Sequence, residues 1–177
     1  MPENPSPQLS VIVPALNEED TIQEVVERLL KLPLNIQVVV VNDGSTDKTS
    51  QILAQYGDRI TVITNAKPGG KGAAIRQAIP FAKGEAVIIQ DADLEYSPEE
   101  IPKLIEPILK GEANVVYGTR FAGGLPKAMA LPNKVVNVLL SWSVGLLFFK
   151  KLSDEATCYK AFRRTLLERM NLTCHRF

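Results

Sequence analysis

Four short apolar runs, each rich in β-branched residues, constrain the fold of this chain more than any other feature. They span residues 9–13, 36–41, 60–64 and 86–90, and residues 115–117 form a weaker fifth run. Runs of this length and composition predict strands. Because they are nearly continuously apolar, they further predict a parallel sheet that is covered on both faces.

Segments with helical periodicity lie between these runs. They span residues 22–30, 46–56, 72–81 and 97–110. The last segment opens with Ser97-Pro98-Glu99-Glu100, which has the pattern of a capping box, and Pro102 and Pro107 should kink or break that helix. The alternation of strands and helices predicts an α/β fold, with a mostly parallel central sheet between two helical layers.

Composition limits the domain count and the classes of partner. With 177 residues the chain is long enough for one domain, expected over residues 9–177 with a short C-terminal part and a mobile tail over residues 1–8. Lys and Arg number 20, as do Asp and Glu, so no overall positive field predicts a nucleic-acid partner. Cys158 and Cys174 have no metal-ligand spacing, which favours a reducing, cytoplasmic setting.

A cluster of polar residues follows each expected strand. In chain order the clusters are PALNEE, NDGSTD, NAKPGGKG, DADLE and GTR. The carboxyl ends of parallel strands lie at one edge of a sheet, and this edge is where such folds bind their ligands. The sequence therefore predicts one composite site from all five clusters.

Three carboxylates stand close together after the fourth strand. Asp91, Asp93 and Glu95 alternate along the chain, so in an extended segment they point the same way. A hard divalent cation, Mg²⁺ or Mn²⁺, would relieve their repulsion and takes carboxylates, waters and substrate phosphates as ligands. The alternative is a solvated turn, with acidic side chains favoured at the start of the following helix.

Two further clusters suggest contacts with an anionic or polar ligand. The amides of Gly69 and Gly70, with the charge of Lys71, could cradle an anion, although the spacing is not that of a Walker A loop. Asp43 could accept hydrogen bonds from a polar ring such as a nucleobase, and Arg120 could bind phosphate. Plain turns and surface solvation are the alternatives for each.

Taken together, five segments in one order resemble the inverting family 2 glycosyltransferases of the GT-A fold. They are VIVPALNEEDTI, VVVNDGSTDKT, GGKGAAIRQA, QDADLEYSPEEIPKL and VVYGTRF. The branch they resemble most is the polyprenyl-phosphate sugar transferases, which include dolichol-phosphate mannosyltransferase, and LSDEATCYKAFRR also fits that branch. The resemblance implies transfer of a hexose from a nucleotide-diphosphate sugar, of GDP-mannose or UDP-glucose type, to a polyprenyl or dolichyl phosphate.

The resemblance also implies a role for each matching residue. Pro14, Ala15, Leu16 and Glu18 would line the nucleotide site, Asp43 would contact the base, and Asp91 and Ala92 would lie against the nucleotide sugar. Asp93 and Glu95, with Asp91 nearby, would bind the divalent metal. Lys71, Arg120 and Lys134 would face phosphates. Asp154 would be an acidic residue near the reaction centre, and Asp93 and Asp154 are the expected catalytic residues.

The chain departs from the family pattern in two respects. Glu95 stands where the branch often has glutamine, which should tighten metal binding. The family usually continues beyond the position of Phe177, so the acceptor side is expected to be incomplete. A nucleotide-sugar-binding module without transfer activity is therefore one alternative, and a transferase that acts on a saccharide hydroxyl is another.

Residues 135–149 form the longest nearly apolar run, and two interpretations of it remain open. It is shorter than the roughly 20 residues that a spanning helix needs. It is either a buried core helix or a helix at a membrane surface, with Trp142 and the flanking Lys150 and Lys151 at the headgroups. The second interpretation predicts a peripheral protein at the cytoplasmic membrane face.

Two other enzyme classes share part of the pattern. Haloacid dehalogenase-type phosphohydrolases also end a strand in D-x-D, but near the N-terminus and with Thr or Val where this chain has Glu95. Nucleotidyltransferases share the strand–helix order but place a Gly-rich loop after the first strand, where this chain has VPALNEE. Both fit the sequence less well than a glycosyltransferase.

Overall fold

The computed structural model describes residues 6–119, 131–149, 154 and 157–173. The chain divides into two compact units, Met1–Val116 with Ala161–Phe177, and Tyr117–Lys160. The single domain expected over residues 9–177 therefore stays a prediction. Of the expected mobile tail, residues 1–5 lie outside the described part of the chain, while the amide of Gln8 donates to the carbonyl of Asn35 at 2.9 Å.

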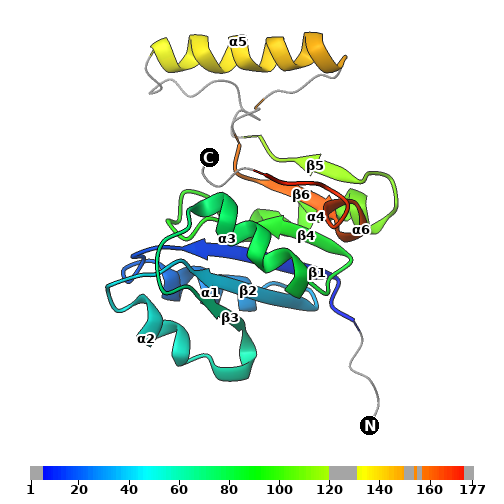
Figure 1. Cartoon of the computed structure of the whole chain (residues 1–177). Coiled ribbons are helices and arrows are strands. Elements are labelled where there is room, and N and C mark those ends of the chain that lie inside the picture. The colour runs from blue at the N-terminus through cyan, green and yellow to red at the C-terminus, as the bar shows by residue number, and fades with distance from the viewer. Residues whose placement is uncertain (1–5, 120–130, 150–153, 155–156, 174–177) are drawn as a thin grey trace. The chain divides into compact units, whose positions relative to one another are not determined.

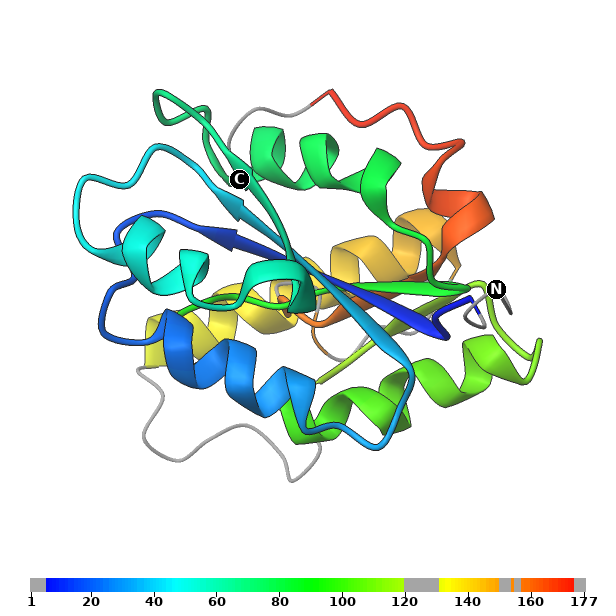
Figure 2. The same cartoon turned by 90° about the horizontal axis from the view of Figure 1, so that it is seen from below.

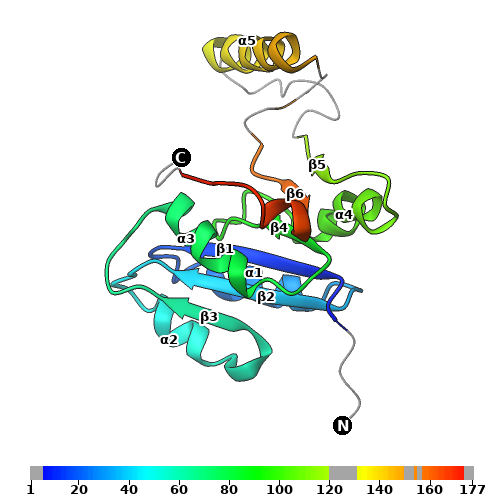
Figure 3. The same cartoon turned by 45° about the vertical axis from the view of Figure 1, so that its right-hand side comes forward.

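Six strands form one sheet in the order β3-β2-β1-β4-β6-β5 (Figure 1). Their bounds are β1 Leu9–Ala15, β2 Ile36–Asn42, β3 Thr61–Thr64, β4 Ala86–Ile89, β5 Val115–Tyr117 and β6 Lys160–Arg163. β1 pairs in parallel with β2 and β4, β2 pairs in parallel with β3, and β6 runs antiparallel to β4. β3 and β5 are the edge strands (Figure 3). The expected α/β class with a mostly parallel sheet is confirmed.

Helices cover both faces of the sheet (Figure 2). In the first compact unit the helices are α1 Ile22–Leu30, α2 Thr49–Ala54, α3 Lys71–Ala78, α4 Ile101–Leu109 and α6 Arg164–Leu167, with 3₁₀ turns η1 Gly57–Arg59, η2 Ile79–Phe81 and η3 Pro98–Glu100. The second unit contains α5 Leu131–Phe148. α3 and α6 pack on one face, where Ala74 and Leu167 join the core around Ile12 and Val39. α1 and α4 cover the opposite face, and their apolar stripes are fully buried.

β6 is the strand that the sequence did not reveal. Its four residues, Lys160-Ala161-Phe162-Arg163, include two cations, so the local signal for a strand is weak. Pairing decides the conformation instead: Phe162 lies opposite Val87 of β4, and its side chain is 8% exposed. A short strand of this kind is defined by its neighbour rather than by its own composition.

For the helix after the acidic cluster, the predicted capping box was wrong, and of the predicted kink or break at the prolines the structure excludes the break. The Ser97 side chain does not cap a helix; residues 98–100 form η3, and α4 begins at Ile101. The helix is not broken by its prolines, because Pro102 lies in the first turn, where no backbone donor is needed, and Pro107 lies inside a helix that continues to Leu109. The helices expected at residues 46–56 and 72–81 correspond to α2 and α3, and both are shorter than expected.

Candidate functional site

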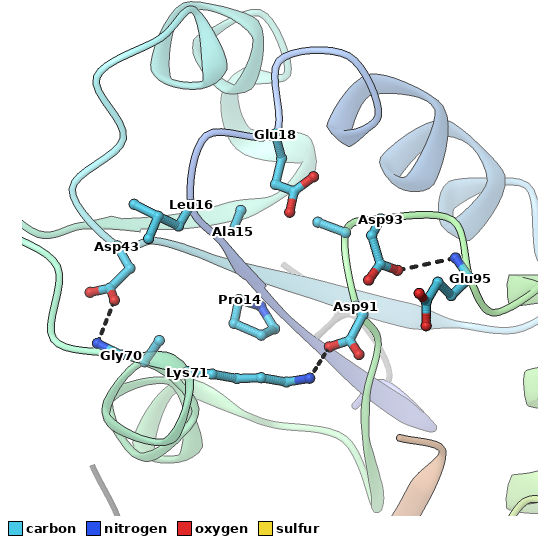
Figure 4. Close-up of a pocket in the computed structure, with 12 residues that line it drawn as sticks. Pro14, Ala15, Leu16, Glu18, Asp43, Gly70, Lys71, Asp91, Asp93 and Glu95 are labelled. Atoms are coloured by element: carbon cyan, nitrogen blue, oxygen red, sulfur yellow. Dashed lines mark hydrogen bonds and ion pairs between the residues drawn. The ribbon is translucent and has the colours of Figure 1, made fainter. Parts of the chain in front are cut away.

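A pocket of about 550 Å³ lies at the carboxyl ends of β1, β2 and β4 (Figure 4). Its walls come from the loops after these strands and from the start of α3. The lining residues are Pro14, Ala15, Leu16, Glu18, Asp43, Gly70, Lys71, Ala74, Asp91, Ala92, Asp93 and Glu95. Parallel pairing of β1 with both neighbours brings these loops, which are distant in sequence, to one edge of the sheet.

Every predicted site residue that precedes position 120 in the chain lines this pocket. Three others do not belong to this group. Arg120 lies outside the described residues, as does the side chain of Lys134, whose backbone is part of α5. Asp154 is 1% exposed and belongs to the second compact unit. The roles expected for these three residues stay predictions.

Reciprocal hydrogen bonds hold the loop after β1 against the loop after β2. The amide of Asn17 donates to Oγ of Ser45 at 2.9 Å, and the amide of Thr46 donates back to Oδ1 of Asn17 at 2.8 Å. The amide of Glu18 donates to Oγ1 of Thr49 at 2.9 Å. Asn17 has φ 57°, a left-handed conformation that asparagine tolerates better than most residues. These hydrogen bonds therefore tie the rim that carries Glu18 to the loop after β2.

The carboxylate of Asp43 is buried at the end of β2 and engages the glycine-rich loop. It accepts hydrogen bonds from Nδ2 of Asn65 at 2.8 Å, from the amide of Gly69 at 2.9 Å and from the amide of Gly70 at 2.7 Å. Burial raises the pKa of Asp43, but these three donors outweigh burial and hold the pKa below its usual value. Asp43 is 3% exposed and remains ionised.

The amides of Gly69 and Gly70 are thus bound by a protein carboxylate, whereas the sequence suggested that they would cradle a ligand anion. The turn needs glycine at position 70, where φ is +93°. It directs the next residue, Lys71, into the pocket, where Nζ lies 2.5 Å from Oδ1 of Asp91 (Figure 4). The positive charge of this loop reaches the pocket through the lysine side chain.

The pocket carries a large excess of negative charge. Its described lining includes the carboxylates Glu18, Asp43, Asp91, Asp93 and Glu95, and Lys71 is the cation among these lining residues. An anionic ligand such as a diphosphate would be repelled by such a site unless a further cation accompanies it. The electrostatics therefore favour a ligand that brings a metal ion.

The loop after β4 presents Asp93 and Glu95 beside each other at the pocket (Figure 4). Oδ1 of Asp93 accepts a hydrogen bond from the amide of Glu95 at 3.0 Å, and Leu94 between them has φ 62°. Gln90 is fully buried at the start of this loop, and it was not among the residues predicted for the site. The sequence signal that could have identified it is an uncharged amide side chain at the end of an otherwise apolar strand.

The three predicted metal ligands do not form one ready cluster. Among the residues that the structure describes, no group of three His, Cys, Asp or Glu side chains is arranged to hold a metal ion. Asp91 is instead paired with Lys71. Mg²⁺ and Mn²⁺ on a nucleotide need one or two carboxylates besides phosphate and water, and Asp93 with Glu95 supplies that donor set. The three residues' joint role as ligands stays a prediction.

Comparison with known proteins gives a consistent set of relatives. The sequence model of the family described as Glycosyl transferase family 2 matches residues 10–170. The undecaprenyl-phosphate 4-deoxy-4-formamido-L-arabinose transferase of Pseudomonas fluorescens (strain Pf0-1) is 33% identical over 177 residues, which cover 94% of this chain and 49% of the relative. The low-salt glycan biosynthesis hexosyltransferase Agl6 of Haloferax volcanii is 33% identical over 94% of this chain and 41% of its own length.

Solved structures resemble the same part of the chain. Glucosyl-3-phosphoglycerate synthase from Mycobacterium tuberculosis, in complex with Mn²⁺, uridine diphosphate and phosphoglyceric acid, superposes with a TM-score of 0.68 at 26% identity, covering 91% of this chain and 57% of that one. S. aureus TarS 1–349 in complex with UDP-GlcNAc has a TM-score of 0.62 at 26% identity, covering 91% and 46%. The chain spans about half the length of the curated relatives it matches.

Proposed function

Because this chain belongs to glycosyl transferase family 2, we propose that it transfers a hexose from a nucleotide-diphosphate sugar to a polyprenyl phosphate. The family and the GT-A fold expected from the sequence are confirmed by the match over residues 10–170 and by the solved glycosyltransferases. The activity itself is a proposal, since the chain corresponds to about half of each curated relative.

The observation that carries the proposal is the pocket at the carboxyl edge of the sheet. It gathers the residues that the resemblance assigns to the donor, from Pro14 to Glu95, in a volume of about 550 Å³. A volume of this order suits a small-molecule ligand. The names of the undecaprenyl-phosphate relatives support the acceptor, although the sugar in those names is an arabinose derivative, a pentose. The name of the hexosyltransferase Agl6 supports a hexose.

Within this pocket we assign the donor contacts as follows. Pro14, Ala15, Leu16 and Glu18 line the nucleotide side, Asp43 lies toward the base, and Asp91 and Ala92 lie toward the sugar. Asp93 and Glu95 would hold Mg²⁺ or Mn²⁺, and Mn²⁺ accompanies uridine diphosphate in the mycobacterial structure. When bound, a divalent cation neutralises the charge that grows on a departing diphosphate.

The acceptor determines whether the chain needs a general base. A phosphate acceptor is largely ionised near neutral pH, with a second pKa of about 6, so it attacks without losing a proton to the protein. Lys71 supplies fixed positive charge in the pocket. A saccharide hydroxyl would need a base, for which Asp154 is the candidate. The relatives' names favour the phosphate acceptor.

A polyprenyl acceptor places the reaction at a membrane surface. No helix among the described residues is both long and apolar enough to cross a bilayer. The described part of α5 exposes large apolar side chains, including Trp142 at 65% and Leu147 at 71%, and none of its described side chains is buried. Exposed apolar side chains of this kind support the interpretation of α5 as a helix at a membrane surface. Lys150 and Lys151, its expected anchors, lie outside the described residues.

The experiment that tests the proposed donor site is calorimetric binding of UDP, GDP and their sugar conjugates, with Mn²⁺ and with chelator. We expect one nucleotide to bind in a metal-dependent manner, and the proposal fails if neither binds under either condition. A second measurement follows transfer of labelled sugar to undecaprenyl phosphate. Binding without transfer by this chain would favour the alternative of a nucleotide-sugar-binding module.

A further inference from the structure

We propose that Gln90 is a positioning residue that sets the conformation of the acid loop, defined as residues 91–96. Its effect on metal and donor binding rests on the proposed function, because Asp93 and Glu95 of this loop are the proposed ligands. Neither the sequence motifs nor the names of the relatives assign a role to Gln90. The assignment comes from the way its side chain connects the two ends of the loop.

Gln90 is a fixed point from which the loop begins. Its backbone amide donates to the carbonyl of Ile12 in β1 at 2.9 Å, and its side chain is fully buried. Nε2 donates to the carbonyl of Asp91 at 3.0 Å and to the carbonyl of Tyr96 at 3.4 Å. The two hydrogens of one amide therefore join the first and last residues of the acid loop.

The loop that is closed in this way has a strained backbone. Leu94 has φ 62°, a left-handed conformation that a side chain with Cβ disfavours. Such a conformation persists only where the surrounding structure imposes it. The Glu95 amide donates to Oδ1 of Asp93 on the same turn, so the strain and the proposed ligands occur together. The two hydrogen bonds from Gln90, which join the ends of the loop, keep this turn closed.

Glutamine is chemically suited to this position. A glutamate of the same shape would place a carboxylate against the carbonyls of Asp91 and Tyr96, and it would add to the negative charge of the pocket. A methionine would fill the same volume without any donor, which would leave both carbonyls without this partner. The neutral amide is thus the side chain of this length that binds both carbonyls.

The test compares Gln90→Met with Ser10→Ala. Ser10 is a matched control because it is also fully buried and also binds through its side chain, with Oγ accepting from the amides of Lys83 at 3.0 Å and Gly84 at 2.8 Å. It lies near the amino end of β1, whereas the pocket lies at the carboxyl end. For each variant, hydrogen exchange of residues 91–96 and the affinity for UDP and GDP with and without Mn²⁺ are measured.

We expect Gln90→Met to speed hydrogen exchange in the acid loop by about tenfold, and to reduce the gain in nucleotide affinity from Mn²⁺ by about tenfold, a change of the size expected when a buried hydrogen-bond donor is removed. Ser10→Ala should lower global stability without either change. The positioning role is overturned if hydrogen exchange in the acid loop is no faster in Gln90→Met than in Ser10→Ala. It is also overturned if exchange is faster in Gln90→Met but Mn²⁺ still increases the nucleotide affinity as much as in the wild type. A wild-type chain that gains nothing from Mn²⁺ overturns the metal site of the proposed function instead, and loop exchange then still decides the role of Gln90.

Discussion

Nζ of Lys71 lies 2.5 Å from Oδ1 of Asp91, and this ion pair spans the pocket from the start of α3 to the loop after β4. The two side chains are 25% and 16% exposed, so the pair is partly screened from solvent. The pair keeps inside the pocket the ammonium group that we propose as a contact for the donor phosphates. A donor phosphate would compete with Asp91 for this ammonium group, so donor binding and the ion pair are linked.

Lys71→Met should weaken donor binding by at least about tenfold, because it removes a charge-assisted contact while keeping the length of the side chain. Calorimetry of the nucleotide-diphosphate sugar in the presence of Mn²⁺ measures the effect. Lys67→Met is the control, since Lys67 is an exposed lysine in the same loop. An equal loss in both variants would mean that general charge, and not the position of Lys71, attracts the donor.

Asp43→Asn should destabilise the fold, because an amide cannot accept from Asn65, Gly69 and Gly70 as the carboxylate does. We expect a loss of about 1–3 kcal/mol at pH 7, in the range for a buried group left with unmatched partners. The pKa of Asp43 is lowered by folding, so its contribution is present above the unfolded value near 3.8 and disappears as the pH falls below it. The difference between wild type and variant should therefore shrink toward pH 2.

Urea unfolding at pH 7 and at pH 3 or below measures this difference for Asp43→Asn. Asp58→Asn provides the comparison, because Asp58 is an exposed carboxylate in η1. If Asp43→Asn is as stable as Asp58→Asn at pH 7, the glycine-rich loop does not depend on the buried carboxylate.

Asp93→Ala should abolish the dependence of nucleotide binding on Mn²⁺ while the chain remains folded, because the exposed side chain contributes little to the core. Asp93→Asn separates charge from structure, since it retains an oxygen that can accept from the amide of Glu95. We expect both variants to lose the metal dependence in calorimetry. Retention of metal-dependent affinity in Asp93→Ala would remove Asp93 from the proposed site.

The strands and the edge of the sheet that holds the pocket were predictable because they depend on local patterns. Residues 9–13 and 86–90 are mostly apolar, and parallel pairing then brings Leu16 and Asp91 to one edge without further information. β6 was not predictable, because its conformation depends on pairing with β4, a partner that is distant in sequence.

The contacts inside the site were less predictable than its location. The sequence placed Asp43 and Gly70 in the same site, but it did not indicate that the carboxylate of one binds the amide of the other. The pairing of Lys71 with Asp91 and the brace from Gln90 also depend on side-chain directions that only the folded chain defines. Sequence patterns identify which residues meet at an edge, while hydrogen bonds decide which of them are available to a ligand.

The pair of Arg28 and Glu99 gives a prediction about pH. Nε of Arg28 donates to Oε1 of Glu99 at 2.9 Å and a terminal nitrogen donates to Oε2 at 2.6 Å, which joins α1 to η3 just after the acid loop. The hydrogen bonds from Arg28 lower the pKa of Glu99 to about 2. Folding lowers this pKa, so the stabilisation is present above the unfolded value near 4.5 and is lost as the pH falls from there toward 2.

Because the side chain of Glu99 is 57% exposed, solvent screening limits the contribution of the pair to about 0.5–1 kcal/mol. A double-mutant cycle of Arg28→Gln and Glu99→Gln at pH 7 should give this coupling, and the same cycle at pH 2 should give a smaller one. High salt should also reduce it. The pair of Glu106 and Lys110, on the surface of α4, is the reference for a solvated ion pair. A coupling at pH 2 equal to that at pH 7 would contradict the charged, bidentate contact as the link between α1 and η3.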